Sequence, residues 1–126
     1  MKLKNLFTLN LFFAVFFGIS CAFLPVWCSK LYDLTPDDAS IWTTRLAGGS
    51  ILGFATLMWF GRKTESIKAR RAIALALLVQ DVVGFLASLE IQLGGRVNAF
   101  GWSSPILYGF LSLAYAYFLF IRPGDI

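Results

Sequence analysis

The chain lacks histidine and has only two cysteines among its 126 residues. Without histidine, imidazole acid–base catalysis and the Ser-His-Asp and Cys-His catalytic arrangements are excluded. Two cysteines leave most transition-metal sites without their usual ligands. No phosphate-binding loop, dinucleotide fingerprint or catalytic serine motif is present, and no pair of groups is spaced for acid–base work. We therefore expect a protein that is not an enzyme and that needs no cofactor or metal.

Charge is also scarce, since charged residues make up 14% of the chain while hydrophobic residues make up 58% and aromatic residues 17%. A soluble domain of this length buries only about two-thirds of its unfolded surface, so this composition would leave large apolar patches in water. A lipid environment removes that conflict. The net charge of +4 comes from basic residues beside apolar stretches, which indicates membrane orientation and not nucleic-acid binding.

Four apolar stretches are each close to the ~20 residues that a helix needs to cross the hydrocarbon of a bilayer. They are residues 6–27, 41–60, 72–93 and 100–121. The segments between them are too short for a soluble domain, so we expect one all-α, four-helix transmembrane bundle spanning 1–126. The first stretch is longer than the 7–15 apolar residues of a secretory signal, which favours an uncleaved span.

Lysine and arginine alternate between the two sides of the predicted bundle. One side holds most of them: Lys2, Lys4, Arg62, Lys63, Lys68, Arg70, Arg71 and Arg122. The opposite side offers Lys30 and Arg96, together with Asp33, Asp37 and Asp38. Because basic loops stay in the cytoplasm, both termini are predicted to be cytoplasmic. The run Thr35-Pro36-Asp37-Asp38 predicts that the second helix begins there, with Thr35 as its N-cap.

One acidic residue falls near the bilayer centre, where an ionised carboxylate costs about 2.5–3.5 kcal/mol. This residue is Asp81, next to Gln80. Counting depth along the helices predicts Ser112 as its hydrogen-bond partner, with Tyr108 and Tyr115 on the same helix face. The cluster is interpreted either as a proton-titrating or ligand-binding site, or as a protonated Asp81 that holds helices together or faces a partner protein.

A second charged pair lies nearer the outer surface. Arg45 and Glu90 fall within about one helical turn of each other in depth, so an ion pair between them is predicted. The alternatives are that Arg45 extends to the surface, or that it binds an anion or a lipid headgroup.

Small and aromatic residues give further patterns in the spans. Gly49 and Gly53 form a G-x-x-x-G pair, and Gly84 is a small residue of the third span; we expect these glycines to pack helices inside the bundle, with a dimer contact as the alternative. The many phenylalanines of the first span face lipid or bind a flat apolar molecule. Cys21 and Cys28, about 10 Å apart along one helix, are expected to be unpaired.

Several short runs resemble those of a widespread group of uncharacterised bacterial four-span proteins. They are Arg45–Gly49, Leu52-Gly53, Trp59–Arg62, Ala69–Ala72, Asp81–Gly84 and Gly101-Trp102 followed by Tyr108. The resemblance covers most of the chain and implies a protein of the bacterial inner membrane, without implying an activity. The Arg-x-x-Gly run that begins at Arg45 is similar to the opening of a span in ergosterol-biosynthesis scaffold proteins.

These observations favour a non-enzymatic accessory or scaffold subunit, whose partners are the bilayer and either other membrane subunits or further copies of itself. Two alternatives stay open. One is a small proton-coupled transporter that uses Asp81, and the other is a protein that binds a lipid, quinone or pigment within the membrane.

Overall fold

The computed structural model describes all residues 1–126 and contains helices and no strands, so the all-α prediction is confirmed. The main helices are α1 (Leu3–Phe23), α2 (Pro25–Leu31), α3 (Asp38–Lys63), α4 (Ile67–Leu93) and α5 (Ser103–Ala116). Shorter helical turns complete the chain: η1 (Ala99–Trp102), η2 (Tyr117–Ile121) and η3 (Pro123–Asp125).

Three helical stretches are long and apolar enough to cross a membrane: Leu3–Phe23, Ile67–Leu93 and Ala99–Ile121. They correspond to the first, third and fourth predicted spans. The helix of the second predicted span, α3, has sufficient length at 26 residues, but it is more polar and is not among the three. The molecule is therefore a helical protein with three candidate membrane-crossing helices.

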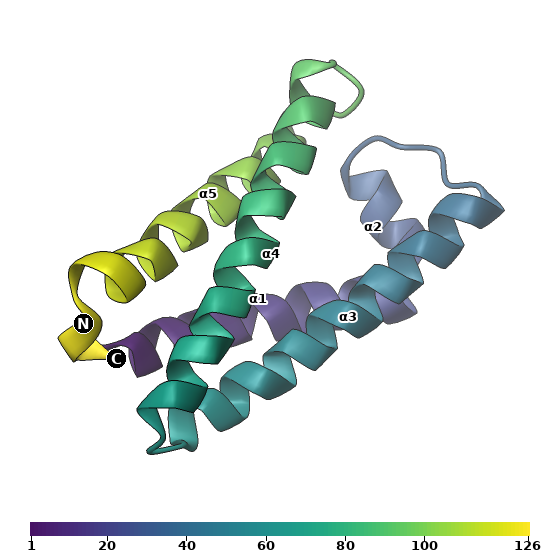
Figure 1. The fold of residues 1–126 in the computed structure, drawn as a ribbon. Helices are drawn as coiled ribbons and strands as arrows, with labels where there is room; N and C mark the ends of the chain where they lie inside the picture. Colours follow the sequence, from purple (N-terminus) through teal and green to yellow (C-terminus); the bar gives the residue numbers. More distant parts are fainter.

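The long helices form two pairs. α1 packs along α3, and α4 packs along α5. Figure 1 shows the two pairs close together where both chain termini and the α3–α4 turn lie, and diverging toward α2 and the α4–α5 connection. We call the first end, with both termini and residues 63–67, the packed end, and the other, with α2 and residues 94–98, the splayed end.

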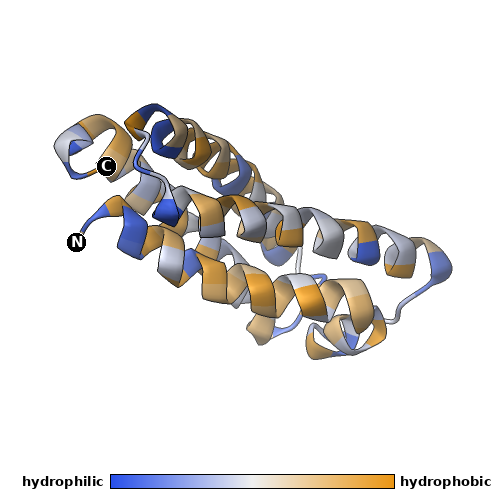
Figure 2. Ribbon diagram, turned by 90° about the horizontal axis from the view of Figure 1, so that it is seen from below, coloured by the Kyte–Doolittle hydropathy of each residue, from blue (hydrophilic) through white to orange (hydrophobic).

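The hydrophobic core is concentrated toward the packed end. It joins side chains from α1, α3, α4, α5 and η2: Leu3, Leu6, Phe7, Ala14, Ala55, Met58, Ala74, Leu77, Leu111, Tyr115, Phe118 and Leu119. Outside this core, many large apolar side chains are exposed, such as Phe12 and Leu113 at 72% and 75%. Figure 2 shows apolar residues on the outer faces of the helices as well as inside. Such a surface suits lipid better than water.

The first predicted span is broken, so the prediction of one continuous helix over 6–27 is wrong. α1 ends at Phe23, and α2 begins at Pro25. A proline disfavours the helical conformation of the residue before it, and Leu24 accordingly leaves that conformation, with φ −126° and ψ 51°. Cys21 and Cys28 therefore lie in successive helices, and both thiols are free.

The N-cap of α3 is Asp37, two residues after the predicted N-cap Thr35, and the helix itself begins at Asp38. The Ser40 backbone N–H donates to Asp37 Oδ1 at 2.7 Å, and the Asp37 N–H donates to Ser40 Oγ at 2.9 Å. This reciprocal capping box satisfies two backbone donors at the helix start. Hydrogen bonds from the Ser40 backbone and side chain hold the Asp37 pKa below its ordinary value of 3.8.

Candidate functional site

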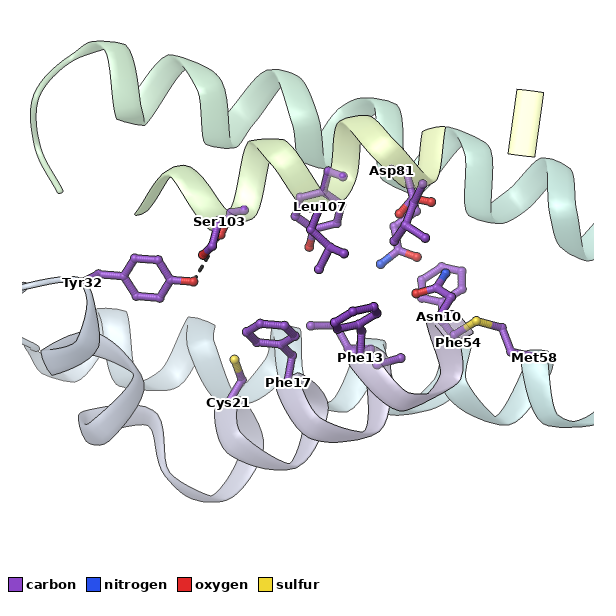
Figure 3. Close-up of a pocket in the computed structure, with 16 residues that line it drawn as sticks. Asn10, Phe13, Phe17, Cys21, Tyr32, Phe54, Met58, Asp81, Ser103 and Leu107 are labelled. Atoms are coloured by element: carbon purple, nitrogen blue, oxygen red, sulfur yellow. Dashed lines mark hydrogen bonds between the residues drawn. The ribbon is translucent and has the colours of Figure 1, made fainter. Parts of the chain in front are cut away.

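A cavity of about 160 Å³ lies between the two helix pairs, where they begin to diverge (Figure 3). All four long helices contribute side chains to its wall, most of them hydrophobic. Asp81 is the only charged residue that lines it. The divergence of the helix pairs thus creates an apolar space around one carboxyl group.

The Asp81 side chain has no partner in the protein. The residue is only 2% exposed, and its Oδ2 atom is buried without a hydrogen bond. The predicted bond to Ser112 is not formed, because the Ser112 hydroxyl donates to the Tyr108 carbonyl of its own helix at 2.7 Å. Serine commonly makes this bond to the carbonyl four residues earlier when it sits within a helix. Asp81 is therefore an unsatisfied acid at the cavity wall.

The structure brings together only part of the predicted polar cluster. Gln80, Asp81 and Tyr108 line the cavity. Tyr115 does not, because it is fully buried in the core, where its hydroxyl accepts a hydrogen bond from Asn10 Nδ2 at 2.9 Å. The same hydroxyl lies 3.9 Å from the Met58 Sδ atom. The Tyr115 hydroxyl is thus satisfied and belongs to the packing below the site.

Asn10 is a buried polar residue of the site that was not predicted from the sequence; Cys21, Tyr32, Ser103 and Ser104 also line the cavity and were not predicted. Asn10 is 6% exposed, lines the cavity from α1, and bonds Tyr115 across the bundle. The available signal was a single amide in an otherwise apolar span, since such a group needs a partner from another helix. In Figure 3, Asn10 and Asp81 lie at the same end of the cavity, on opposite sides.

Aromatic side chains form the wall that faces Asp81. Phe13 and Phe17 project from α1, and Phe54 projects from α3 (Figure 3). Tyr108 on α5 completes this set of rings, and its position depends on Gly84. A Cβ atom at Gly84 would lie 2.8 Å from the Tyr108 ring, so only glycine allows the ring to pack this closely on α4. Gly84 is thus a helix-packing residue, as expected.

The splayed end of the cavity is bridged by hydrogen bonds between α2 and the α4–α5 region. The Tyr32 hydroxyl lies 3.2 Å from Ser104 Oγ, and its ring centroid lies 5.3 Å from that of Phe100. Asn98 Nδ2 donates to the Leu31 carbonyl at 2.9 Å. Because few contacts join the helix pairs here, these bonds are the main closure of the cavity at this end.

Gly49 and Gly53 do not pack the bundle, so that prediction is wrong for both residues. A Cβ atom at either position would have no neighbour within 4 Å. The adjacent Gly48 makes the close contact instead, since a Cβ atom there would lie 2.8 Å from the Ala22 Cα atom. One residue along a helix is a rotation of about 100°, which turns the Gly49–Gly53 face away from α1 and toward the surroundings.

The predicted ion pair between Arg45 and Glu90 is also absent. Both residues are exposed, and the single ion pair of the protein joins Arg122 to Asp125 at 3.9 Å. Equal depth was the basis for the prediction, but α3 and α4 diverge from their shared turn (Figure 1). The distance between these helices is therefore large at the level of Arg45.

The comparisons with known proteins give no independent guide to this site. No protein-family model, no curated protein and no solved structure matches the chain. The cavity itself offers one unpartnered carboxyl, a set of aromatic rings, and hydroxyl and amide groups.

Proposed function

We propose that this chain is a non-enzymatic, four-span protein of the bacterial inner membrane, with both termini in the cytoplasm. In its cavity it binds a small, mainly apolar molecule that carries one polar group. The four spans would be the three candidate spans and α3, which packs along α1. At 1.5 Å per residue, a helix of 26 residues extends about 39 Å, enough to cross a bilayer core of ~30 Å.

The distribution of charge supports this orientation. The packed end carries the basic residues of the termini and of the α3–α4 turn, while the acidic segment before α3 lies at the splayed end. Arg62 and Lys63 stack over the ring of Trp59, at 4.1 and 4.2 Å from its centroid. Tryptophan and basic side chains gather at the membrane–water interface, and the excess of Lys and Arg marks the cytoplasmic side.

The observation that carries the binding proposal is the Asp81 carboxyl, which is buried at an aromatic-lined cavity and has no partner. A group of this kind inside a membrane is costly and is usually retained for function. An apolar cavity of ~150 Å³ in another protein takes up benzene, so a cavity of about 160 Å³ has room for a molecule with one ring.

Native mass spectrometry of the protein, extracted gently from its own membrane, tests this proposal. We expect a bound small molecule on the wild-type chain. Leu107→Trp should lose that molecule because Leu107 lines the cavity. Leu113→Trp is the matched control, since Leu113 is 75% exposed on the same helix. A bare protein mass for the wild type, or equal occupancy in both variants, would contradict the proposal.

A second candidate, an accessory subunit of a membrane complex, is favoured by the outward face of α3. A Cβ atom at Gly49 or Gly53 would meet nothing within 4 Å, so this face of α3 is open, and small residues of this spacing let another helix approach closely. The G49L/G53L variant should then lose copurifying subunits, while Leu113→Trp keeps them. If the wild-type protein purifies alone at its own mass, this second candidate fails.

A further inference from the structure

We propose that the molecule bound in the cavity is a small organic cation, with one ring or a short apolar body and a single ammonium group. This inference rests on the proposed function and adds the chemical class of the ligand. The juxtaposition that carries it is a lone buried carboxyl and several aromatic rings that line one mainly apolar cavity.

Asp81 has no basic side chain near it that could balance its charge. No lysine or arginine lines the cavity, and Asp81 makes no ion pair with any residue of the chain. Other basic side chains cannot supply one: those of the packed end lie beyond the core, and Lys30, Arg45 and Arg96 are exposed and do not line the cavity. A buried carboxylate without a cation is strongly unfavourable. A ligand that brings its own positive charge would satisfy Asp81 without any change in the fold.

The cavity wall on the other helix pair includes several aromatic side chains. Phe13, Phe17 and Phe54 line the side of the cavity opposite the helix pair that carries Asp81 (Figure 3). The Tyr108 ring, which packs against Gly84, also lines the cavity. Aromatic faces attract ammonium groups, and the attraction strengthens when water is excluded. A neutral apolar ligand would gain from the rings but would leave the carboxyl unpaired. An ammonium ion gains from both walls at once.

The volume of the cavity limits the size of the ligand. A cavity of about 160 Å³ is close to the ~150 Å³ that holds one benzene molecule. Compounds such as 2-phenylethylammonium, with one ring and a two-carbon arm, match this space. The hydroxyl groups of Ser104 and Tyr32 bond each other at the far end of the cavity. Asp81 is the one charged acceptor in the wall, and the other polar groups there are neutral, so the ammonium group is expected to pair with Asp81.

The alternative chemistry is a neutral ligand such as a quinone, which offers only carbonyl acceptors. An ionised Asp81 would repel those oxygens, while a protonated Asp81 would donate to them. The two ligand classes therefore differ in their response to a positive charge on the probe, and a pair of compounds of equal shape distinguishes them.

The experiment measures binding of 2-phenylethylammonium and of the neutral 2-phenylethanol to the full chain in lipid nanodiscs, with empty nanodiscs correcting for partition into lipid. Charge-assisted hydrogen bonds are the stronger class, so we expect the wild type to bind the ammonium compound about tenfold more tightly or better. Asp81→Asn should bring the ratio of the two affinities close to one. Leu113→Trp should keep the wild-type ratio.

Equal affinity of the wild type for both compounds overturns the cation proposal but leaves cavity binding standing. Binding of neither compound, while the gently extracted protein carries its own bound molecule, overturns the cation class in the same way. If Asp81→Asn does not fold, the ratio measured for the wild type still decides. Absence of any bound molecule in native mass spectrometry is a separate result, and it overturns the proposed function itself.

Discussion

Two buried polar side chains of the bundle differ in whether they have a hydrogen-bond partner. At the packed end, the Tyr115 hydroxyl is fully buried and accepts a hydrogen bond from Asn10 at 2.9 Å. At the cavity, the Asp81 carboxyl is 2% exposed and has no partner. Tyr115 contributes to stability, whereas an unpaired Asp81 works against it. This difference separates a closely packed region from the cavity in which we propose that a molecule binds.

The helix pairs show the same contrast. Near the packed end, apolar side chains from every long helix meet in one core. Toward the splayed end, hydrogen bonds at Tyr32 and Asn98 replace that core. A close-packed core resists changes of volume, while a cavity held by a few polar bonds opens at low cost.

The largest effect is expected where α1 and α3 touch. Gly48→Leu forces a side chain against the backbone of Ala22, which cannot move aside as a flexible side chain can. Overpacking of this kind costs about 1–3 kcal/mol or more, so thermal unfolding in detergent should occur at a much lower temperature. Gly49→Leu is the control, because its Cβ meets nothing. Equal loss of stability in both variants would contradict the assigned faces of α3.

A smaller loss is expected from Tyr115→Phe. Removing the hydroxyl leaves the buried Asn10 amide without its acceptor, at a cost of about 1 kcal/mol. The double variant N10L/Y115F removes both partners and should recover most of the lost stability. Denaturant titration of the wild type, Tyr115→Phe and N10L/Y115F checks this order of stabilities. If the double variant is the least stable of them, the bond is not what stabilises this region.

The closure at the splayed end is expected to be weak. Tyr32→Phe removes the hydrogen bond to Ser104, and bonds of this kind within membranes average about 0.6 kcal/mol. The cavity should then open about two- to threefold more often, and alkylation of Cys21, which lines it, should speed up by that factor in a Cys28→Ser background. Tyr117→Phe is the control, and equal labelling rates would contradict the closure.

The N-cap of α3 gives a small, pH-dependent effect outside the membrane. The folded-state pKa of Asp37 lies below its ordinary value of 3.8, so its stabilisation is present above that value and is lost as the pH falls through the lower one. Asp37→Asn caps comparably but does not titrate. Between about pH 6 and about pH 3, the melting temperature of the wild type should therefore fall by a small amount relative to that of Asp37→Asn. A constant difference would contradict the cap.

Composition and spacing were enough to predict an all-helical chain and the three helices that are long and apolar enough to cross a membrane, because apolar runs of ~20 residues are typical of membrane spans. Composition and spacing did not predict where a helix breaks, or which face of a helix contacts its neighbour. Pro25 breaks a run that is apolar throughout, and the choice of Gly48 over Gly49 depends on the angle at which α1 crosses α3.

The site was predicted only in part. Asp81, Gln80 and Tyr108 were identified from depth along the spans, and all three line the cavity. Depth alone could not show that Ser112 bonds its own backbone, or that α3 and α4 diverge and separate Arg45 from Glu90. Which side chains meet across a bundle depends on the rotation and tilt of the helices. Packing between helices sets these angles, and the length of an apolar stretch does not.

The most direct test of the contrast between packing and binding is the melting temperature of Asp81→Asn beside that of the wild type, both in nanodiscs stripped of bound molecules. If the carboxyl is kept for a ligand, the isosteric amide removes a costly buried acid, and the variant should melt at the same temperature or higher. A clear decrease would show that Asp81 holds the helices together, and would contradict its assignment as a binding group.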